Sequence, residues 1–233
     1  MSAHKRRSNN GSAAVTDRRT LILDAAVHVI AQSGVRGLRI EKLAAEAGIS
    51  TALIYYHFHD RAGLIRSALS FINDRAARYT AQAQASLNLR TQIEQMLLLE
   101  IQGTRSVREN SIAWGELRAS AVFNDELRGQ LRAATEDWSA DLAHVIRMAQ
   151  DAGLADADVD ASDAAQRLTA MIEGLSQRWL SESITLERAQ QLLVGSIMAE
   201  LGEPPYPPTS PDVRGQRLLT EKRTTPEGLQ RQR

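Results

Sequence analysis

The sequence has 233 residues, 43% of them apolar and 24% charged, a composition typical of a globular protein built from good helix formers such as Ala, Leu and Arg. It contains no cysteine, which excludes disulfides, thiolate metal sites and cysteine nucleophiles. The basic start of the chain is not followed by an apolar segment, and no later apolar run has the length of a membrane span. We therefore expect a cytoplasmic protein.

The formal net charge of zero hides a strong asymmetry along the chain. Residues 1–70 carry 10 basic and 5 acidic residues, a net charge of +5. Residues 71–202 carry 12 basic and 19 acidic residues, a net charge of −7. A basic front joined to an acidic body indicates that the front binds a polyanion and the body does not.

The first seventy residues predict a flexible basic arm over 1–15 and then four helices. An apolar stripe of period 3.6 predicts a helix over 17–32, with Thr16 as its N-cap and Gly34 as its end. Shorter stripes predict helices over 39–47, ending at Gly48, and over 51–57, beginning after Ser50. A longer helix follows Asp60 and extends from about residue 61 to 83.

The rest of the chain predicts long helices separated by caps and glycines. Asn124, Asp160 and Thr185 precede apolar periodic runs, and Gly153 follows one. From Glu203 onward, prolines and charges replace the apolar residues, so we expect residues 203–233 to be disordered. The predicted helices cover about 90–106, 109–121, 125–151, 161–182 and 186–201. The prediction is an all-α chain with an N-terminal three-helix domain over 16–70 and a C-terminal helical bundle over 71–202.

Residues Gly48–Phe58, GISTALIYYHF, lie at the centre of a predicted helix-turn-helix. In this motif the second helix enters a DNA major groove and presents side chains to phosphates and base edges. The polar or compact side chains of the second helix suit those contacts, and Leu53 suits a thymine methyl group. The candidates for DNA contact are Ser50, Thr51, Leu53, Tyr55, Tyr56 and His57, with Arg61 as a phosphate clamp. Ile54 and Phe58 are expected in the core.

The segment Gly34–Leu69, GVRGLRIEKLAAEAGISTALIYYHFHDRAGLIRSAL, resembles the DNA-binding domain of the TetR family of bacterial transcriptional regulators. The shared pattern runs from a glycine through a hydrophobic-Ala pair and Ala-Gly-Val-Ser to Tyr-x-His/Tyr-Phe and a following Lys. The resemblance adds Ala52 to the recognition-helix positions and places Arg61 where the family has a phosphate-binding lysine. Arg39 stands where the family has a capping Ser or Thr, which removes a cap and adds a cation near the DNA backbone.

The resemblance also implies a dimer formed by the last two long helices, with Gly174 and Gly195 allowing close helix approach. The alternative is that their apolar faces are buried within one chain. The segment WGELRASAVFNDELR, Trp114–Arg128, resembles the corresponding region of BetI-like members at a few positions. The dimer candidates are Leu168, Ile172, Leu175, Leu192, Leu193, Ile197 and Leu201.

Bulky side chains of the second domain are candidates for an effector pocket, although large apolar residues at helical spacing more often form a core. His144 is a candidate for fixing a polar group of the ligand. The pocket candidates are Trp114, Phe123, Trp138, His144, Met148, Met171 and Trp179.

These observations predict a ligand-responsive regulator, most simply a repressor, that binds a palindromic operator as a homodimer and needs no metal or cofactor. One alternative is a helical interaction protein with no DNA role. The other is a metal-dependent enzyme using His57, His59 and Asp60 of the HFHD segment. Two histidines two residues apart point to different sides of a helix, which disfavours the metal site.

Overall fold

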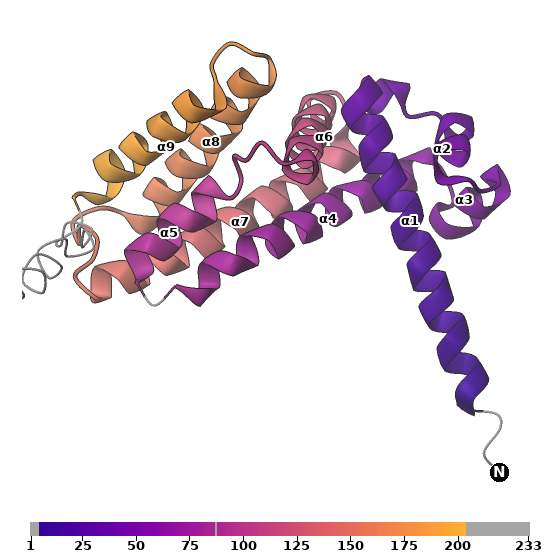
Figure 1. Ribbon diagram of the computed structural model, residues 1–233, viewed down its shortest axis with the longest axis horizontal. Helices are drawn as coiled ribbons and strands as arrows, with labels where there is room; N and C mark the ends of the chain where they lie inside the picture. The colour runs from indigo at the N-terminus through magenta and orange to yellow at the C-terminus, as the bar shows by residue number, and fades with distance from the viewer. Residues whose placement is uncertain (1–4, 87, 204–233) are drawn as a thin grey trace, which may run out of the picture. The chain divides into compact units, whose positions relative to one another are not determined.

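The computed structural model describes residues 5–86 and 88–203, and within these ranges the chain forms helices and no strands (Figure 1). The predicted disordered tail, apart from Glu203, lies outside the described residues. No helix in the described ranges is both long and apolar enough to cross a bilayer. The helices are α1 Lys5–Gly37, α2 Ile40–Ala47, α3 Thr51–Phe58, α4 Arg61–Thr80, the 3₁₀ helix η1 Ala81–Ala85, α5 Leu89–Leu98, α6 Arg105–Ala121, α7 Asp125–Asp151, α8 Ala161–Leu180 and α9 Leu186–Leu201.

Most predicted helix ends are confirmed by the capping geometry. Ser50 and Asp60 accept hydrogen bonds from the backbone N–H groups of Leu53 and Gly63, at 3.3 and 2.6 Å. Gly48 ends α2 in the left-handed region at φ 65°. Such caps satisfy the backbone groups that have no partner inside a helix, which is why they mark helix ends. The caps predicted at Asn124, Asp160 and Thr185 are also present.

The start of α1 differs from the prediction. The helix begins at Lys5, so the prediction of Thr16 as its N-cap is wrong, while the flexibility predicted for residues 1–15 stays a prediction. Residues 5–15 have no apolar stripe, but extending an existing helix is easy because each added residue closes one hydrogen bond. Gly34 interrupts α1 as expected, with φ 69° and ψ 171° inside the helix.

The first helix of the body also ends earlier than predicted. We expected one helix over 90–106, whereas α5 stops at Leu98 and a turn carries the chain to α6. Thr104 is the N-cap of α6 and accepts a hydrogen bond from Val107 N at 3.4 Å. The apolar residues Leu97, Leu98, Leu99 and Ile101 continue the helical pattern through the turn, so periodicity alone could not find the break.

Two hydrophobic cores organise residues 17–203. The first unites α1–α4 with Ala113 and Leu117 of α6 and Leu127 and Leu131 of α7. The second joins α5, α7, α8 and α9. Helices α1–α4 are therefore packed directly on α6 and α7, and the predicted domain boundary at residue 70 stays a prediction.

Candidate nucleic-acid interface

Helices α2 and α3 form the predicted helix-turn-helix around Gly48. Leu43 of α2 and Ile54 and Phe58 of α3 are buried in the first core, as expected for the last two. Burying the Ile54 and Phe58 side of α3 turns its opposite side outward. Helix α3 therefore packs by its apolar side on the first core, to which α6 and α7 also contribute side chains.

The outward side of α3 carries an unusual pair of exposed aromatic residues. The side chains of Tyr55 and Tyr56 are 48% and 71% exposed. His57 is half-buried, and its ring lies edge-on to that of Tyr56, with 5.2 Å between centroids. Ser50 and Ala52 are exposed, and Thr51 and Leu53 are half-buried. These seven side chains form the candidate recognition face, and a protein exposes such aromatics to water at a cost unless a partner covers them.

Arg61 has a structural partner that sequence reasoning missed. Its Nε donates to the carbonyl of Leu38 at 2.8 Å, and its Nη2 donates to the carbonyl of Val35. Both carbonyls lie at the junction of α1 and α2, where helix ends leave acceptors short of intrahelical partners, and the Val35 carbonyl also accepts from the Leu38 N–H at 3.2 Å. Arg61 therefore ties the start of α4 to that junction. Arg39 is exposed and makes no side-chain cap for α2, in agreement with the prediction.

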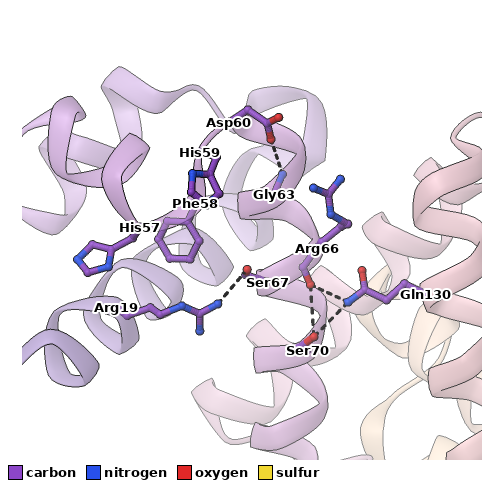
Figure 2. Close-up of a pocket in the computed structure, with 10 residues that line it drawn as sticks. All are labelled: Arg19, His57, Phe58, His59, Asp60, Gly63, Arg66, Ser67, Ser70 and Gln130. Atoms are coloured by element: carbon purple, nitrogen blue, oxygen red, sulfur yellow. Dashed lines mark hydrogen bonds between the residues drawn. The ribbon is translucent and has the colours of Figure 1, made fainter. Parts of the chain in front are cut away.

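A cleft of about 370 Å³ opens beside the end of α3 (Figure 2). Its basic side chains include Arg19 of α1 and Arg66 of α4, together with His57 and His59. Arg19 donates to Ser67 Oγ at 3.1 Å, and its guanidinium lies 5.2 Å from the centre of the Phe58 ring. The sequence indicated Arg19 only through the net charge of the front. Its position next to His57 adds it to the candidate phosphate contacts.

Hydrogen bonds and ion pairs connect the DNA-binding unit to the body. The backbone N–H of Val35 donates to Glu116 Oε2 of α6 at 3.1 Å. His28 Nδ1 lies 2.9 Å from Glu109 Oε1 of α6. Burial acts to raise the pKa of the Glu109 carboxyl, but hydrogen bonds from Arg105 and His28 outweigh it and lower that pKa. Helix α6 is therefore the main contact between the body and α1.

The effector-pocket candidates do not converge on one cavity. Phe123 is 85% exposed, and His144, Met148 and Met171 also lie on the surface. Trp179 is buried beneath the Arg108 guanidinium, and Trp138 packs on the second core. Trp114 donates from Nε1 to Glu173 Oε1 at 3.0 Å. The prediction of a common pocket is thus not supported, because periodicity locates an apolar side chain on a helix without showing what that side faces.

Most of the predicted dimer residues are buried within their own chain. Six of the seven are buried in the second core of their own chain, and Leu192 packs against it half-buried. The intrachain alternative is correct for the six buried side chains, and Leu192 stays a candidate. In the described part of the chain, no group of three or more His, Asp or Glu residues is placed to hold a metal ion. The buried six are Leu168, Ile172, Leu175, Leu193, Ile197 and Leu201.

Comparisons with known proteins agree with this architecture. Residues 22–68 match the model for bacterial regulatory proteins of the tetR family, and residues 89–202 match the C-terminal model for BetI-type transcriptional repressors. The HTH-type transcriptional regulator BetI of Rhizobium meliloti is 28% identical over 82% of this chain and 94% of its own length. The HTH-type transcriptional regulator TtgR of Pseudomonas putida is 25% identical over 70% of this chain and 80% of its own.

Solved structures extend the comparison to three dimensions. A protein from Rhodococcus sp. assigned to the TetR family is 43% identical, with a TM-score of 0.76 over 80% of this chain and 99% of its own. A transcriptional regulator from Saccharomonospora viridis, crystallised with choline, is 26% identical, with a TM-score of 0.72 over 80% of this chain and 98% of its own. The exposed recognition helix, the two matching models and these relatives lead to one conclusion: the chain belongs to the TetR family of bacterial transcriptional regulators.

Proposed function

We propose that this regulator is a repressor that binds a pseudo-palindromic operator as a homodimer and releases it when a small molecule binds the body. The observation that carries the proposal is the exposed Tyr55, Tyr56 and His57 face of α3, supported from behind by the core. The net charge of +5 over residues 1–70 provides the attraction to DNA phosphates. Two recognition helices related by a twofold axis read half-sites about 34–36 Å apart, or a multiple of that distance.

Replacing Tyr56 with Ala is expected to weaken operator binding about tenfold or more without lowering thermal stability. Tyr56 is 71% exposed and its ring contacts His57 of the same face, so its loss should weaken groove contacts and leave the core intact. The operator is first isolated by selection from random duplex DNA, and binding is then measured by fluorescence anisotropy. Phe123→Ala is the matched control, because Phe123 is 85% exposed and lies outside α1–α4. Equal affinities for wild type and Tyr56→Ala would contradict the proposed recognition face.

We propose that the dimer uses the outer side of α8 and α9 instead of the buried side. Met171 and Met198 are each 41% exposed there, and Gly174 and Gly195 are also exposed. A Cβ atom added at either glycine would meet no atom within 4 Å in the protomer. Glycines with open space in front of them allow the backbone of a second helix to approach closely, so this outer side suits helix packing across a twofold axis.

Gly195→Arg is expected to dissociate the dimer while the protomer stays folded. The new side chain has space in a single chain but would occupy the position of the partner's helices. Sedimentation velocity measures the association state, and circular dichroism measures the fold. Gly129→Arg on α7 is the matched control, since a Cβ atom there also meets nothing within 4 Å. A dimer of unchanged stability in Gly195→Arg would place the interface elsewhere.

The effector remains part of the proposal because residues 89–202 match the C-terminal model of BetI-type repressors and the similar regulator from Saccharomonospora viridis was crystallised with choline. A ligand can release DNA only if it binds more tightly to the conformation that does not fit the operator. The relationship is reciprocal, so the operator weakens ligand binding by the same factor, with a typical coupling of about 1–3 kcal/mol. Helix α4 begins in the DNA-binding unit and ends in the body, which makes it the direct mechanical link.

A further inference from the structure

Helix α1 is kinked at Gly34, immediately before the segment that leads into α2. Gly34 has φ 69° and ψ 171°, values outside the helical region. The N–H groups that follow such a kink lack the acceptors that an unbroken helix would supply. The N–H of Val35, the next residue, donates to Glu116 Oε2 of α6 at 3.1 Å. A carboxylate of the body therefore accepts a backbone donor at the entrance to the helix-turn-helix.

The Glu116 carboxylate lies directly against the backbone at this kink. A Cβ atom added at Gly34 would stand 2.6 Å from Glu116 Oε2, closer than a side chain can come. Gly34 therefore meets two requirements, a positive φ and the close approach of α6. Among the side chains that the structure describes, no Lys, Arg or His forms an ion pair with Glu116. The bond to Val35 is thus what distinguishes this half-buried carboxylate from a surface charge.

The backbone of Val35 is held from its other side as well. Arg61 of α4 donates from Nη2 to the Val35 carbonyl and from Nε to the Leu38 carbonyl, the latter at 2.8 Å. The side chains of Val35 and Leu38 are buried, and Arg39, the first residue flanking α2, follows directly. Few rotatable bonds separate this segment from α2. A displacement of Val35 therefore moves α2 and the recognition helix α3 that follows it.

Helix α6 holds α1 at two points along one side. Glu109 and Glu116 are seven residues apart, close to two helical turns, so they lie on the same side of α6. Their partners on α1 have the same spacing, since His28 Nδ1 lies 2.9 Å from Glu109 Oε1 and Val35 N binds Glu116. Ala113, between the two contacts, is fully buried. These matched contacts fix the position of α1 along α6.

The opposite side of α6 is attached to α8, so α6 lies between α1 and α8 (Figure 1). Trp114 and Arg118 are each two residues from Glu116, which places them about 160° around the helix from it. Both donate to Glu173 Oε1 of α8, Trp114 at 3.0 Å. Gly174, the next residue of α8, belongs to the outer side that we propose for the dimer. Consecutive contacts therefore lead from that side of α8 through α6 to the helix-turn-helix.

We infer that Glu116 is a positioning residue for operator binding, and that its hydrogen bond to Val35 sets the separation of the two recognition helices in the dimer. The inference rests on the proposed homodimeric repressor and adds the residue that fixes the spacing of its half-sites. A bond from a backbone N–H to a carboxylate suits this role, because charge-assisted hydrogen bonds are shorter and stronger than neutral ones. Glu116 acts through the backbone of Val35 and needs no contact with DNA.

The test measures how strongly the full-length protein discriminates between operators that differ in half-site spacing. The operator is selected from random duplex DNA, and versions with one base pair added or removed between the half-sites are compared by fluorescence anisotropy. One base pair moves a half-site by about 3.4 Å along the duplex and about 35° around it. We expect wild type to bind the selected spacing at least about tenfold more tightly than either altered spacing.

Glu116→Asp and Glu116→Ala are expected to lower this preference to about threefold or less. Aspartate keeps the charge but is one methylene too short to reach Val35 N, and alanine removes the acceptor. Glu116→Gln keeps an oxygen acceptor and should retain the wild-type preference within about twofold. Glu136→Ala, on the exposed surface of α7, is the control. A smaller folded fraction lowers the affinity for every spacing by the same factor, so the ratio of affinities reports positioning alone.

An unchanged preference in Glu116→Asp and Glu116→Ala would overturn the inference and leave the proposed repressor in place. A preference lost equally in Glu116→Gln would do the same, because that variant keeps the acceptor. If Glu116→Ala does not fold, the comparison of Glu116→Asp with Glu116→Gln decides alone. Selection of single, unpaired half-sites would reject the homodimeric repressor, and the inference with it.

Discussion

Replacing Arg61 with Ala is expected to lower the free energy of unfolding by about 3 kcal/mol, the larger of two stability effects that the structure predicts. The guanidinium donates to the carbonyls of Leu38 and Val35, and hydrogen bonds from charged groups contribute about 1.5–3 kcal/mol each. Removing it leaves both carbonyls at the α1–α2 junction without this donor. The junction sets the angle of α2, so DNA affinity should fall together with stability.

Urea unfolding followed by circular dichroism measures this effect. Arg39→Ala is the control, because Arg39 is exposed, lies next to the same junction and makes no capping hydrogen bond. The alternative role of Arg61 as a phosphate clamp makes a different prediction. If Arg61 acts only as a phosphate clamp, Arg61→Ala keeps the stability of wild type and reduces the salt dependence of DNA binding by about one unit per phosphate contact. A full-stability Arg61→Ala protein with that smaller salt slope would show that the DNA contact is its main role.

Replacing Glu100 with Gln is expected to stabilise the ligand-free protein above neutral pH by about 2–3 kcal/mol and to have little effect near pH 5. Burial raises the pKa of the Glu100 carboxyl from 4.5 to about 7, although the Tyr79 hydrogen bond acts to lower it. A carboxyl with a raised pKa in the fold resists ionisation there. The free energy of unfolding of wild type is therefore highest, as far as Glu100 decides it, below the unfolded pKa of 4.5, where the carboxyl is protonated in both states. This stability is lost as the pH rises through the folded pKa of about 7.

The measurement is the free energy of unfolding of both proteins from about pH 5 to pH 8, a range that spans the titration. The difference between Glu100→Gln and wild type should grow with pH and level off above the folded pKa. Glu136→Gln removes the same charge from an exposed position and should show a difference near zero throughout. A constant difference between Glu100→Gln and wild type across this range would mean that the Glu100 carboxyl titrates normally in the fold.

The sequence by itself determined the helix-turn-helix and the class of the fold, because the responsible interactions are local. A cap such as Ser50 or Asp60 bonds a backbone N–H three residues away, and Gly48 adopts its left-handed conformation without help from distant residues. The spacing of Ile54 and Phe58 likewise selected the buried side of α3, which left the Tyr55 and Tyr56 side outward. The buried side of α3 was therefore predictable to the level of single residues.

Only the tertiary structure decided what each apolar or charged side chain contacts. An apolar stripe such as Leu168, Ile172 and Leu175 has the same sequence pattern whether it packs on α7 of the same chain or on a second copy. The hydrophobic effect is not directional, so the pattern does not identify the partner. The guanidinium of Arg61 reaches carbonyls more than twenty residues earlier in the chain. Glu100 accepts a hydrogen bond from Tyr79, which Asn110 also contacts, only because the chain turns after Leu98. These contacts join segments far apart in sequence, and no local pattern carries that information.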